Sequence, residues 1–204
     1  MERIVNDFQL NIATANGTGS QSANLIILHT MFNMGVPVSG KNLFPSNISG
    51  LPTWYILRVS DHGYQAPGDR THIQVLMNKA TWEEDIENCL PGTLIVYNQD
   101  VKMPVERDDC TVIGAPMTKM ARGLNPKLGR MIANMVYVGI LAEILGLDDA
   151  ALDDAVAAQF KGKAKAIDLN TQAVDLGRTH VRENVDVEQI PFRIEGREVD
   201  DDLF

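Results

Sequence analysis

Apolar and polar residues alternate along the first stretch of the chain, DFQLNIA at residues 7–13. A period of two is typical of a strand with one buried face. From Ser20 onward the apolar residues follow a helical spacing, and Gly35 suits the end of that helix. The start of the chain therefore predicts a strand, a glycine-containing turn and a helix.

Later apolar runs predict the remaining strands of a sheet. These runs are short and are separated by turn residues and helical segments. The predicted strands are WYILRVSD (54–61), HIQVLMN (72–78), GTLIVYN (92–98) and TVIGAP (111–116). Residues 36–52 are rich in proline and glycine, so we expect a short strand and a long, shaped loop there.

Helical spacing returns in four further segments. Residues 81–90, TWEEDIENCL, predict a short helix with Thr81 as its N-cap. Residues 128–147 are apolar nearly all round and predict a central helix that is covered on most sides. Residues 148–160 and 167–177 predict two amphipathic helices. The alternation of strands and helices predicts an α/β layered domain, with a mixed sheet flanked by helices.

Composition divides the chain near residue 180. Residues 1–180 carry the strand and helix patterns and are expected to form one domain of the 204-residue chain. Residues 181–204 are acidic, show no helical period and include three consecutive aspartates. We expect them to form an extended acidic C-terminal arm or linker outside the core.

Charge and cysteine content narrow the class of protein. The formal net charge of −9 argues against nucleic acid or an anionic membrane surface as the main partner. The two cysteines, Cys89 and Cys110, have no metal-ligand spacing and are expected to be reduced thiols. No apolar run is long enough to span a bilayer, and the first residues lack the apolar core of a signal peptide. We therefore expect a soluble, cytoplasmic protein.

The turn between the first strand and helix is the main candidate for chemistry. Residues 17–22, GTGSQS, fit G-x-G-x-x-G except that Ser22 replaces the third glycine. Such a turn places backbone N–H groups at the positive end of a helix dipole, which suits anions. The same glycines are expected if the turn only needs positive φ angles or a close backbone approach. The sequence leaves these two interpretations equally open.

Other nucleotide and catalytic motifs are incomplete. A dinucleotide site needs an acidic residue about 20 positions after the glycine turn, whereas the first acid here is Asp61. Residues 35–42, GVPVSGKN, match G-x-x-x-x-G-K but follow a helix and end in Asn42, where a magnesium-binding hydroxyl belongs. The evidence for a dinucleotide site is therefore weak, and we reject the motif at residues 35–42. The histidines are scattered and form no ordered triad: His29, His62, His72 and His180.

Three stretches resemble one family together and in order. They are NGTGSQSA in the glycine turn, NLFPSNISGLPTW followed by YILRVS, and NMVYVGILAEILGL in the central helix. They resemble the gamma subunit or gamma domain of the 2-oxoacid:ferredoxin (acceptor) oxidoreductases, over roughly residues 8–180. The form most similar is the one fused at, or encoded beside, the N-terminus of a 2-oxoglutarate-type alpha subunit. The chain departs from the family at residues 18–20 of the glycine turn and at Ser49-Gly50-Leu51, where many members have Arg-Gly-Gly.

The resemblance implies a complex that decarboxylates a 2-oxoacid, such as 2-oxoglutarate, on thiamine diphosphate. Its electrons would pass through iron–sulfur clusters to ferredoxin or a similar acceptor, and its acyl group to coenzyme A. The chain has no G-D-G…N-N motif and no cysteine set for clusters, so it is not expected to be catalytic alone. Thiamine diphosphate, magnesium and the clusters are expected on partner alpha and beta subunits. This chain would pack against them in a hetero-oligomer.

The resemblance also implies two groups of site residues. Backbone groups of the glycine turn would meet the phosphates of coenzyme A: Asn16, Gly17, Thr18, Gly19, Ser20 and Gln21. The loop that follows would form an interface or lid: Phe44, Pro45, Ser46, Asn47 and Trp54. Internal packing of that loop is an equal alternative. For the whole chain the alternatives are a free-standing nucleotide- or coenzyme A-binding module and a purely structural assembly subunit.

Overall fold

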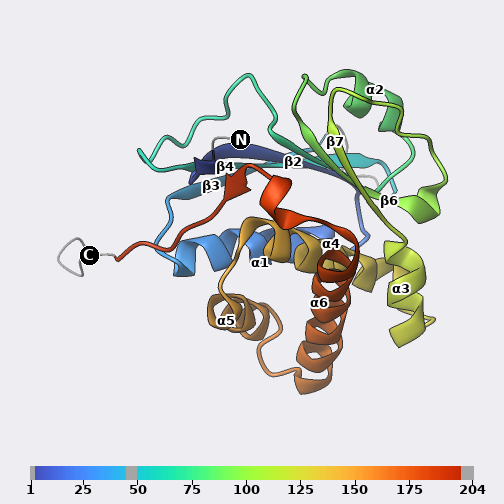
Figure 1. Ribbon diagram of the computed structural model, residues 1–204. Helices are drawn as coiled ribbons and strands as arrows, with labels where there is room; N and C mark the ends of the chain where they lie inside the picture. Colours follow the sequence, from blue (N-terminus) through green and yellow to red (C-terminus); the bar gives the residue numbers. More distant parts are fainter. Residues whose placement is uncertain (1–2, 45–49, 199–204) are drawn as a thin grey trace.

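A six-stranded mixed sheet forms the centre of the computed structural model, which describes residues 3–44 and 50–198 (Figure 1). The strands in spatial order are β3 (Val38–Leu43), β4 (Pro52–Ser60), β2 (Asp7–Ala15), β5 (Ile73–Leu76), β6 (Leu94–Asn98) and β7 (Thr111–Ala115). β4 runs antiparallel to both of its neighbours, whereas β2, β5, β6 and β7 run parallel to one another. A separate parallel pair joins β1 (Ile4–Val5) to β8 (Phe192–Arg193). The predicted mixed sheet flanked by helices is confirmed.

Most of the helices cover one face of the sheet (Figure 1). The six helices of the described residues are α1 (Ser20–Asn33), α2 (Trp82–Glu87), α3 (Met117–Leu124), α4 (Gly129–Leu145), α5 (Asp149–Gln159) and α6 (Ala164–Asn184). Short 3-10 turns lie at Gln99–Val101 (η1) and Val187–Gln189 (η2). The N-cap of α5 is Asp148, whose carboxylate accepts a hydrogen bond from the Ala151 N–H at 2.9 Å.

The core lies between the sheet and α4, as the apolar run of that helix predicts. Alternate residues of β2 point toward the helices and are fully buried, because the strand has one apolar face. α4 packs closely on α6 through two glycines: a Cβ at Gly139 would lie 2.0 Å from the Val174 carbonyl oxygen, and one at Gly177 would lie 2.1 Å from that of Val136. None of the described helices is both long enough and apolar enough to cross a bilayer by itself. Only α3 and α4 taken together reach the required length and apolar composition, and they are bent by 116° relative to each other.

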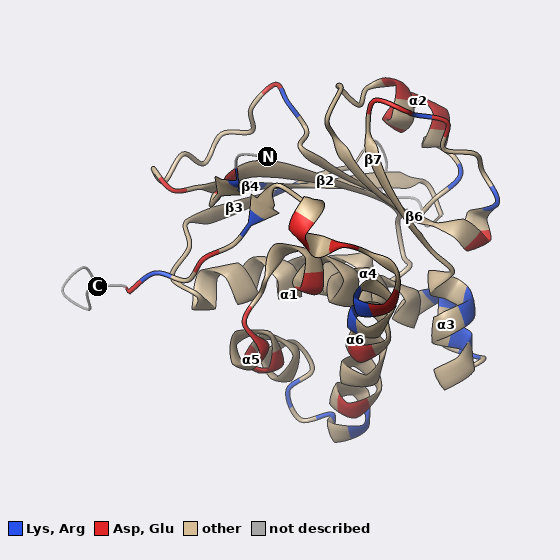
Figure 2. Cartoon of the chain, in the orientation of Figure 1, with Lys and Arg blue, Asp and Glu red and all other residues tan. Residues whose placement is uncertain are grey.

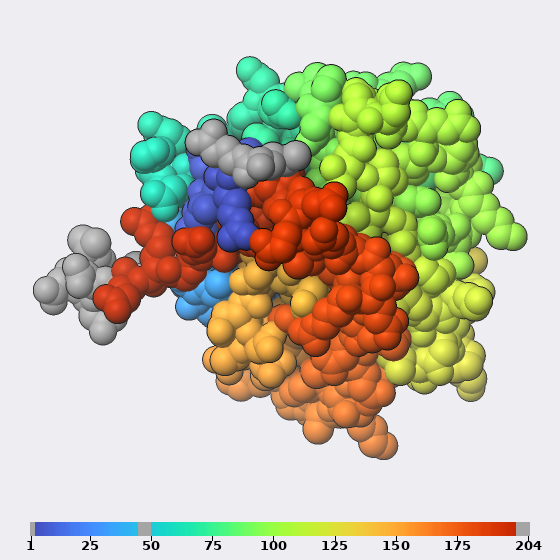
Figure 3. All heavy atoms as spheres, viewed as in Figure 1, coloured from blue at the N-terminus to red at the C-terminus, as the bar shows by residue number. Residues whose placement is uncertain are grey.

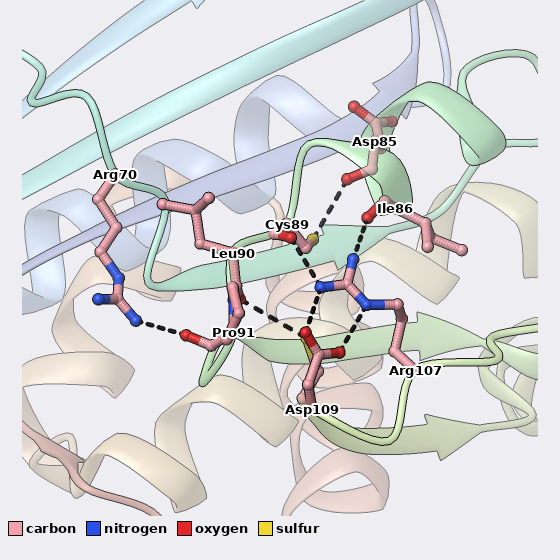
Figure 4. Close-up of polar contacts among 9 residues, drawn as sticks. Arg70, Asp85, Ile86, Cys89, Leu90, Pro91, Arg107 and Asp109 are labelled. Carbon is pink, nitrogen blue, oxygen red and sulfur yellow. Dashed lines mark hydrogen bonds and ion pairs between the residues drawn. The ribbon is translucent and has the colours of Figure 1, made fainter.

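A small lobe, formed by α2 and residues 99–110, covers part of the opposite face of the sheet (Figure 1). Arg107 holds this lobe together, as Figure 4 shows. Its guanidinium donates to the carbonyl oxygens of Ile86 at 2.7 Å and Cys89 at 2.8 Å, and it forms an ion pair with Asp109 at 2.7 Å. Thr81 takes the predicted N-cap position of α2, but its hydroxyl donates to the Asp85 carboxylate at 2.6 Å instead of accepting from the helix.

Residues 181–198 pack more closely than their acidic composition predicts. α6 continues through residue 184, and the segment after it returns beside the N-terminal strand (Figure 3). Three of its side chains belong to the core: Ile190, Phe192 and Ile194. They occupy every second position, which is the apolar pattern of a strand, but the charged residues around them obscure this pattern in the sequence. The segment differs from the expected arm as far as residue 194, while residues 199–204 lie outside the described residues.

Candidate functional site

A crevice of about 550 Å³ opens where three parallel strands end. Its floor is formed by the last residues of β2, by Met77 after β5 and by Asn98 at the end of β6, and its walls come from α3 and α4. Ligands of open α/β sheets bind at the carboxyl ends of parallel strands, where loops and helix termini leave a depression. The position of the crevice therefore makes it the first candidate site.

The crevice is strongly basic although the chain is acidic. Four basic side chains line it: Lys102, Lys119, Arg122 and Arg130. The acid in the lining is Asp100, whose carboxylate accepts a hydrogen bond from the backbone N–H of Lys119 at 2.7 Å. Two of the basic residues, Lys119 and Arg122, belong to α3, which carries blue segments in Figure 2. A concave surface lined by one sign of charge attracts ligands of the opposite sign, so the crevice suits an anion.

Backbone and side-chain contacts hold the basic groups in place. Asn98 donates to the Thr118 hydroxyl at 2.8 Å and accepts from the Asp100 N–H at 3.3 Å, which ties η1 to α3. Lys102 has a φ of 58°, a left-handed conformation that is unfavourable for a residue with a side chain. Gly129 leaves room for a basic side chain, because a Cβ there would lie 2.4 Å from the Cγ of Arg122.

The glycine turn forms one rim of this crevice. Thr18 lines the crevice, and its carbonyl oxygen accepts a hydrogen bond from the Asn134 amide at 2.8 Å. Gly17 and Gly19 have φ angles of 80° and 82°, and a Cβ at Gly19 would lie 2.7 Å from the Cγ of Met131. Local conformation and close packing therefore account for both glycines. Anion binding by the turn is compatible with this geometry but is not required by it.

A second cavity of about 340 Å³ lies on the other side of the turn. Among its lining residues are five of the six residues predicted in the turn: Asn16, Gly17, Gly19, Ser20 and Gln21. Phe44, which is 47% exposed, lines the same cavity, so the structure brings one predicted lid residue to the turn. Trp54 instead contacts the small lobe, where its indole N–H donates to Asp85 at 2.8 Å. Pro45, Ser46 and Asn47 lie outside the described residues.

The basic residues of the crevice were missed in the sequence because they belong to no known motif. They come from η1, α3 and α4, which only the fold brings together. One signal was available: residues 110–142 contain no aspartate or glutamate, although the whole chain has 27 such residues. A long stretch without acids in an acidic chain is a charge asymmetry that points to a binding surface.

Other candidates do not form a site. The rejected motif at residues 35–42 begins in the turn after α1 and continues into the edge strand β3, where Lys41 is exposed, so it is no phosphate loop. Both cysteines are free, and burial raises the pKa of Cys89 to about 11, which keeps this thiol protonated near neutral pH. Within residues 3–44 and 50–198, no group of three or more His, Cys, Asp and Glu side chains is placed to hold a metal ion.

Comparison with known proteins identifies relatives over most of the chain. The family model "Pyruvate ferredoxin/flavodoxin oxidoreductase" matches residues 9–180. The alpha subunit of 2-oxoacid:ferredoxin oxidoreductase 2 from Aeropyrum pernix is 25% identical over an alignment 221 positions long, which covers 87% of this chain and 34% of that subunit. The chain therefore spans about a third of the length of this relative.

Solved structures share the fold. The 2-oxoglutarate:ferredoxin oxidoreductase of Magnetococcus marinus, solved with 2-oxoglutarate, coenzyme A and succinyl-CoA bound, superposes with a TM-score of 0.84 and 23% identity. The match covers 95% of this chain and 34% of that one. A keto/oxoacid ferredoxin oxidoreductase gamma subunit from Geobacter sulfurreducens PCA superposes with a TM-score of 0.69 and 12% identity, over 86% of this chain and 99% of that subunit. At these identities the likeness establishes the fold.

Proposed function

Because this chain belongs to the pyruvate ferredoxin/flavodoxin oxidoreductase family, we propose that it is the gamma component of a 2-oxoacid:acceptor oxidoreductase. The complex would convert a 2-oxoacid such as 2-oxoglutarate to its acyl-CoA and deliver the electrons to ferredoxin or a similar acceptor, in the cytoplasm. This chain would pack against the thiamine-binding alpha and beta subunits or domains. Thiamine diphosphate, magnesium and iron–sulfur clusters would be held by those partners.

The basic crevice carries the more specific part of the proposal. Coenzyme A bears a diphosphate and a further phosphate, so its nucleotide end is strongly anionic. Lys119, Arg122 and Arg130 line a single crevice and would form charge-assisted hydrogen bonds with these phosphates. A role for this chain at the coenzyme A end of the site follows from that charge and from its place at the carboxyl edge of the sheet.

We assign two supporting roles to the predicted site residues. Backbone groups of residues 16–21 would contact coenzyme A at the rim of the crevice, where Thr18 lies. Phe44 would belong to the interface or lid, because it is half exposed beside the same turn. Trp54 would contribute to the interface only through the small lobe, which lies on the opposite face of the sheet.

The Michaelis constant for coenzyme A in the reconstituted complex tests this role. Arg122→Gln removes one charged hydrogen-bond donor, so we expect the KM for coenzyme A to rise about tenfold while the KM for the 2-oxoacid stays constant. Lys41→Gln, on the exposed edge strand β3, is the matched control and should change neither constant. An unchanged KM for coenzyme A in Arg122→Gln would refute the assignment. Calorimetry on the isolated chain with coenzyme A, ATP and NAD separates this role from that of a general nucleotide-binding module.

A further inference from the structure

An apolar groove lies between the first turns of α4 and α6, next to the glycine turn. Its volume is about 430 Å³, and its apolar walls include Met131, Ile132, Met135, Phe160 and Leu169. Leu128 and Met131 are 42% and 53% exposed, which is high for large apolar side chains near the start of a core helix. Contiguous exposed apolar surface of this kind marks an interaction site more often than chance exposure does.

Basic residues stand at the mouth of this groove. Lys163 and Lys165 belong to its lining, and Lys161 lies two positions earlier in the α5–α6 turn. Figure 2 shows this turn in blue, and residues 155–167 contain no acidic side chain. The loop before α4 also carries Lys127, which lies in sequence between the lining residues Asn125 and Leu128. In a chain with a net charge of −9, positive charge around an apolar groove is a local exception that needs a complementary ligand.

We propose that this groove binds an acidic segment of a companion subunit, which inserts an apolar side chain beside Met131 and Leu169 while its carboxylates pair with Lys163 and Lys165. The proposal rests on the proposed function, because that function supplies the companion subunit. A second copy of this chain is a poorer occupant, since both copies are acidic overall and would repel each other. The groove and the second cavity share Gly19 and Met131, so the companion would lie directly beside the glycine turn.

Photo-crosslinking identifies the occupant. The residue to replace is Leu128, with benzoylphenylalanine, because Leu128 is exposed at the groove and its side chain is not required by the core. The crosslinking is done in the complex reconstituted from this chain and its thiamine- and cluster-binding companion chains. We expect the crosslinked peptide to come from a companion and to contain an apolar residue flanked by Asp or Glu. Crosslinks to a second copy, or none in the assembled complex, would overturn the proposal.

Binding affinity gives an independent readout. The double variant Lys163→Glu/Lys165→Glu should weaken association with the companion chains by at least about tenfold at low salt, and by less at high salt, because screening removes the electrostatic part. Leu128→Asp should also weaken association, and we expect the helix to form in this variant because position 128 is the N-cap of α4, a position at which Asp is common. Leu128→Asn caps the helix equally well without the charge, so it separates lost apolar contact from repulsion.

The outcomes separate this proposal from the function on which it rests. If the unmodified chain does not associate with the companion chains, both are wrong. If it associates and supports turnover, while the lysine and Leu128 variants bind as well as the unmodified chain, the groove proposal is wrong and the proposed function stands. Lys41→Glu, which reverses an exposed charge on β3 outside the groove, should bind like the unmodified chain.

Discussion

The left-handed backbone at Lys102 places a basic residue in the crevice at a conformational cost. For residues other than glycine this conformation costs roughly 1–2 kcal/mol. The structure maintains it through η1, where the Lys102 N–H donates to the Gln99 carbonyl oxygen at 3.1 Å. Strained residues cluster at functional sites, which agrees with a ligand-binding role for this side chain.

Lys102→Gly tests whether the side chain serves binding rather than folding. Glycine adopts the left-handed conformation readily, so the melting temperature should stay constant or rise. The KM for coenzyme A should rise about tenfold, because one ionic contact to a phosphate is lost. Lys102→Arg keeps the charge and should leave that KM unchanged. A fall in melting temperature with an unaltered KM would assign Lys102 a structural role instead.

His72 makes the stability of the fold depend on pH. Burial lowers its pKa, and the nearby Arg70 and Arg58 lower it further, against a smaller opposing effect of Asp7. The neutral ring is also the form that fits, because its Nδ1 accepts a hydrogen bond from the Gln9 N–H at 3.1 Å. The folded state therefore binds this proton less tightly than the unfolded chain, whose histidine titrates near its ordinary value of about 6.5.

The resulting prediction has a definite sign. The stability due to neutral His72 is fully present above the unfolded pKa of about 6.5 and is lost as the pH falls through the lower folded pKa. We expect the unfolding free energy to fall less between pH 7 and pH 5 in His72→Asn than in the unmodified protein, because the Asn side-chain oxygen can accept the same hydrogen bond without titrating. Urea unfolding of both proteins near these two pH values measures the difference. Equal falls for the two proteins would show that other groups control the acid sensitivity.

At the scale of elements, the contact between α4 and α6 depends on glycines rather than on interlocking side chains. Gly177→Val would force the backbones apart, because even a Cβ there lies 2.1 Å from the Val136 carbonyl oxygen. We expect the unfolding free energy to fall by at least about 2 kcal/mol, as overpacked cores do. Chemical denaturation measures this change.

The control for that variant is another helical glycine. Gly123 lies within α3, and a Cβ added to it meets no atom within 4 Å. Gly123→Ala should stabilise the protein by about 0.5–1 kcal/mol, because alanine loses less backbone entropy in a helix. Equal effects of Gly177→Val and Gly123→Ala would mean that the helices separate without cost.

Sequence periodicity predicted those elements whose burial pattern is local. The alternation in β2 and the all-round apolar character of α4 depend on neighbouring positions alone, and both elements are where they were expected. β8 was missed, since two residues among acidic neighbours give too short a pattern. The same limit applies to the site: the glycine turn is one continuous segment, whereas Lys102 and Arg130 line the same crevice only because the fold places η1 and α4 at its border.

The distribution of charge over the whole molecule leads to a prediction about salt. A net charge of −9 repels an anionic ligand at long range, while the crevice with Lys119 and Arg122 attracts it at short range. Because the Debye length is about 10 Å at 0.1 M salt and about 3 Å at 1 M, added salt screens contacts at the mouth of the crevice. In the reconstituted complex the KM for coenzyme A should therefore rise with sodium chloride, and the KM for pantetheine, which lacks phosphates, should not. Parallel responses of the two constants would show that salt acts on assembly or chemistry and that the crevice is not the site of phosphate binding.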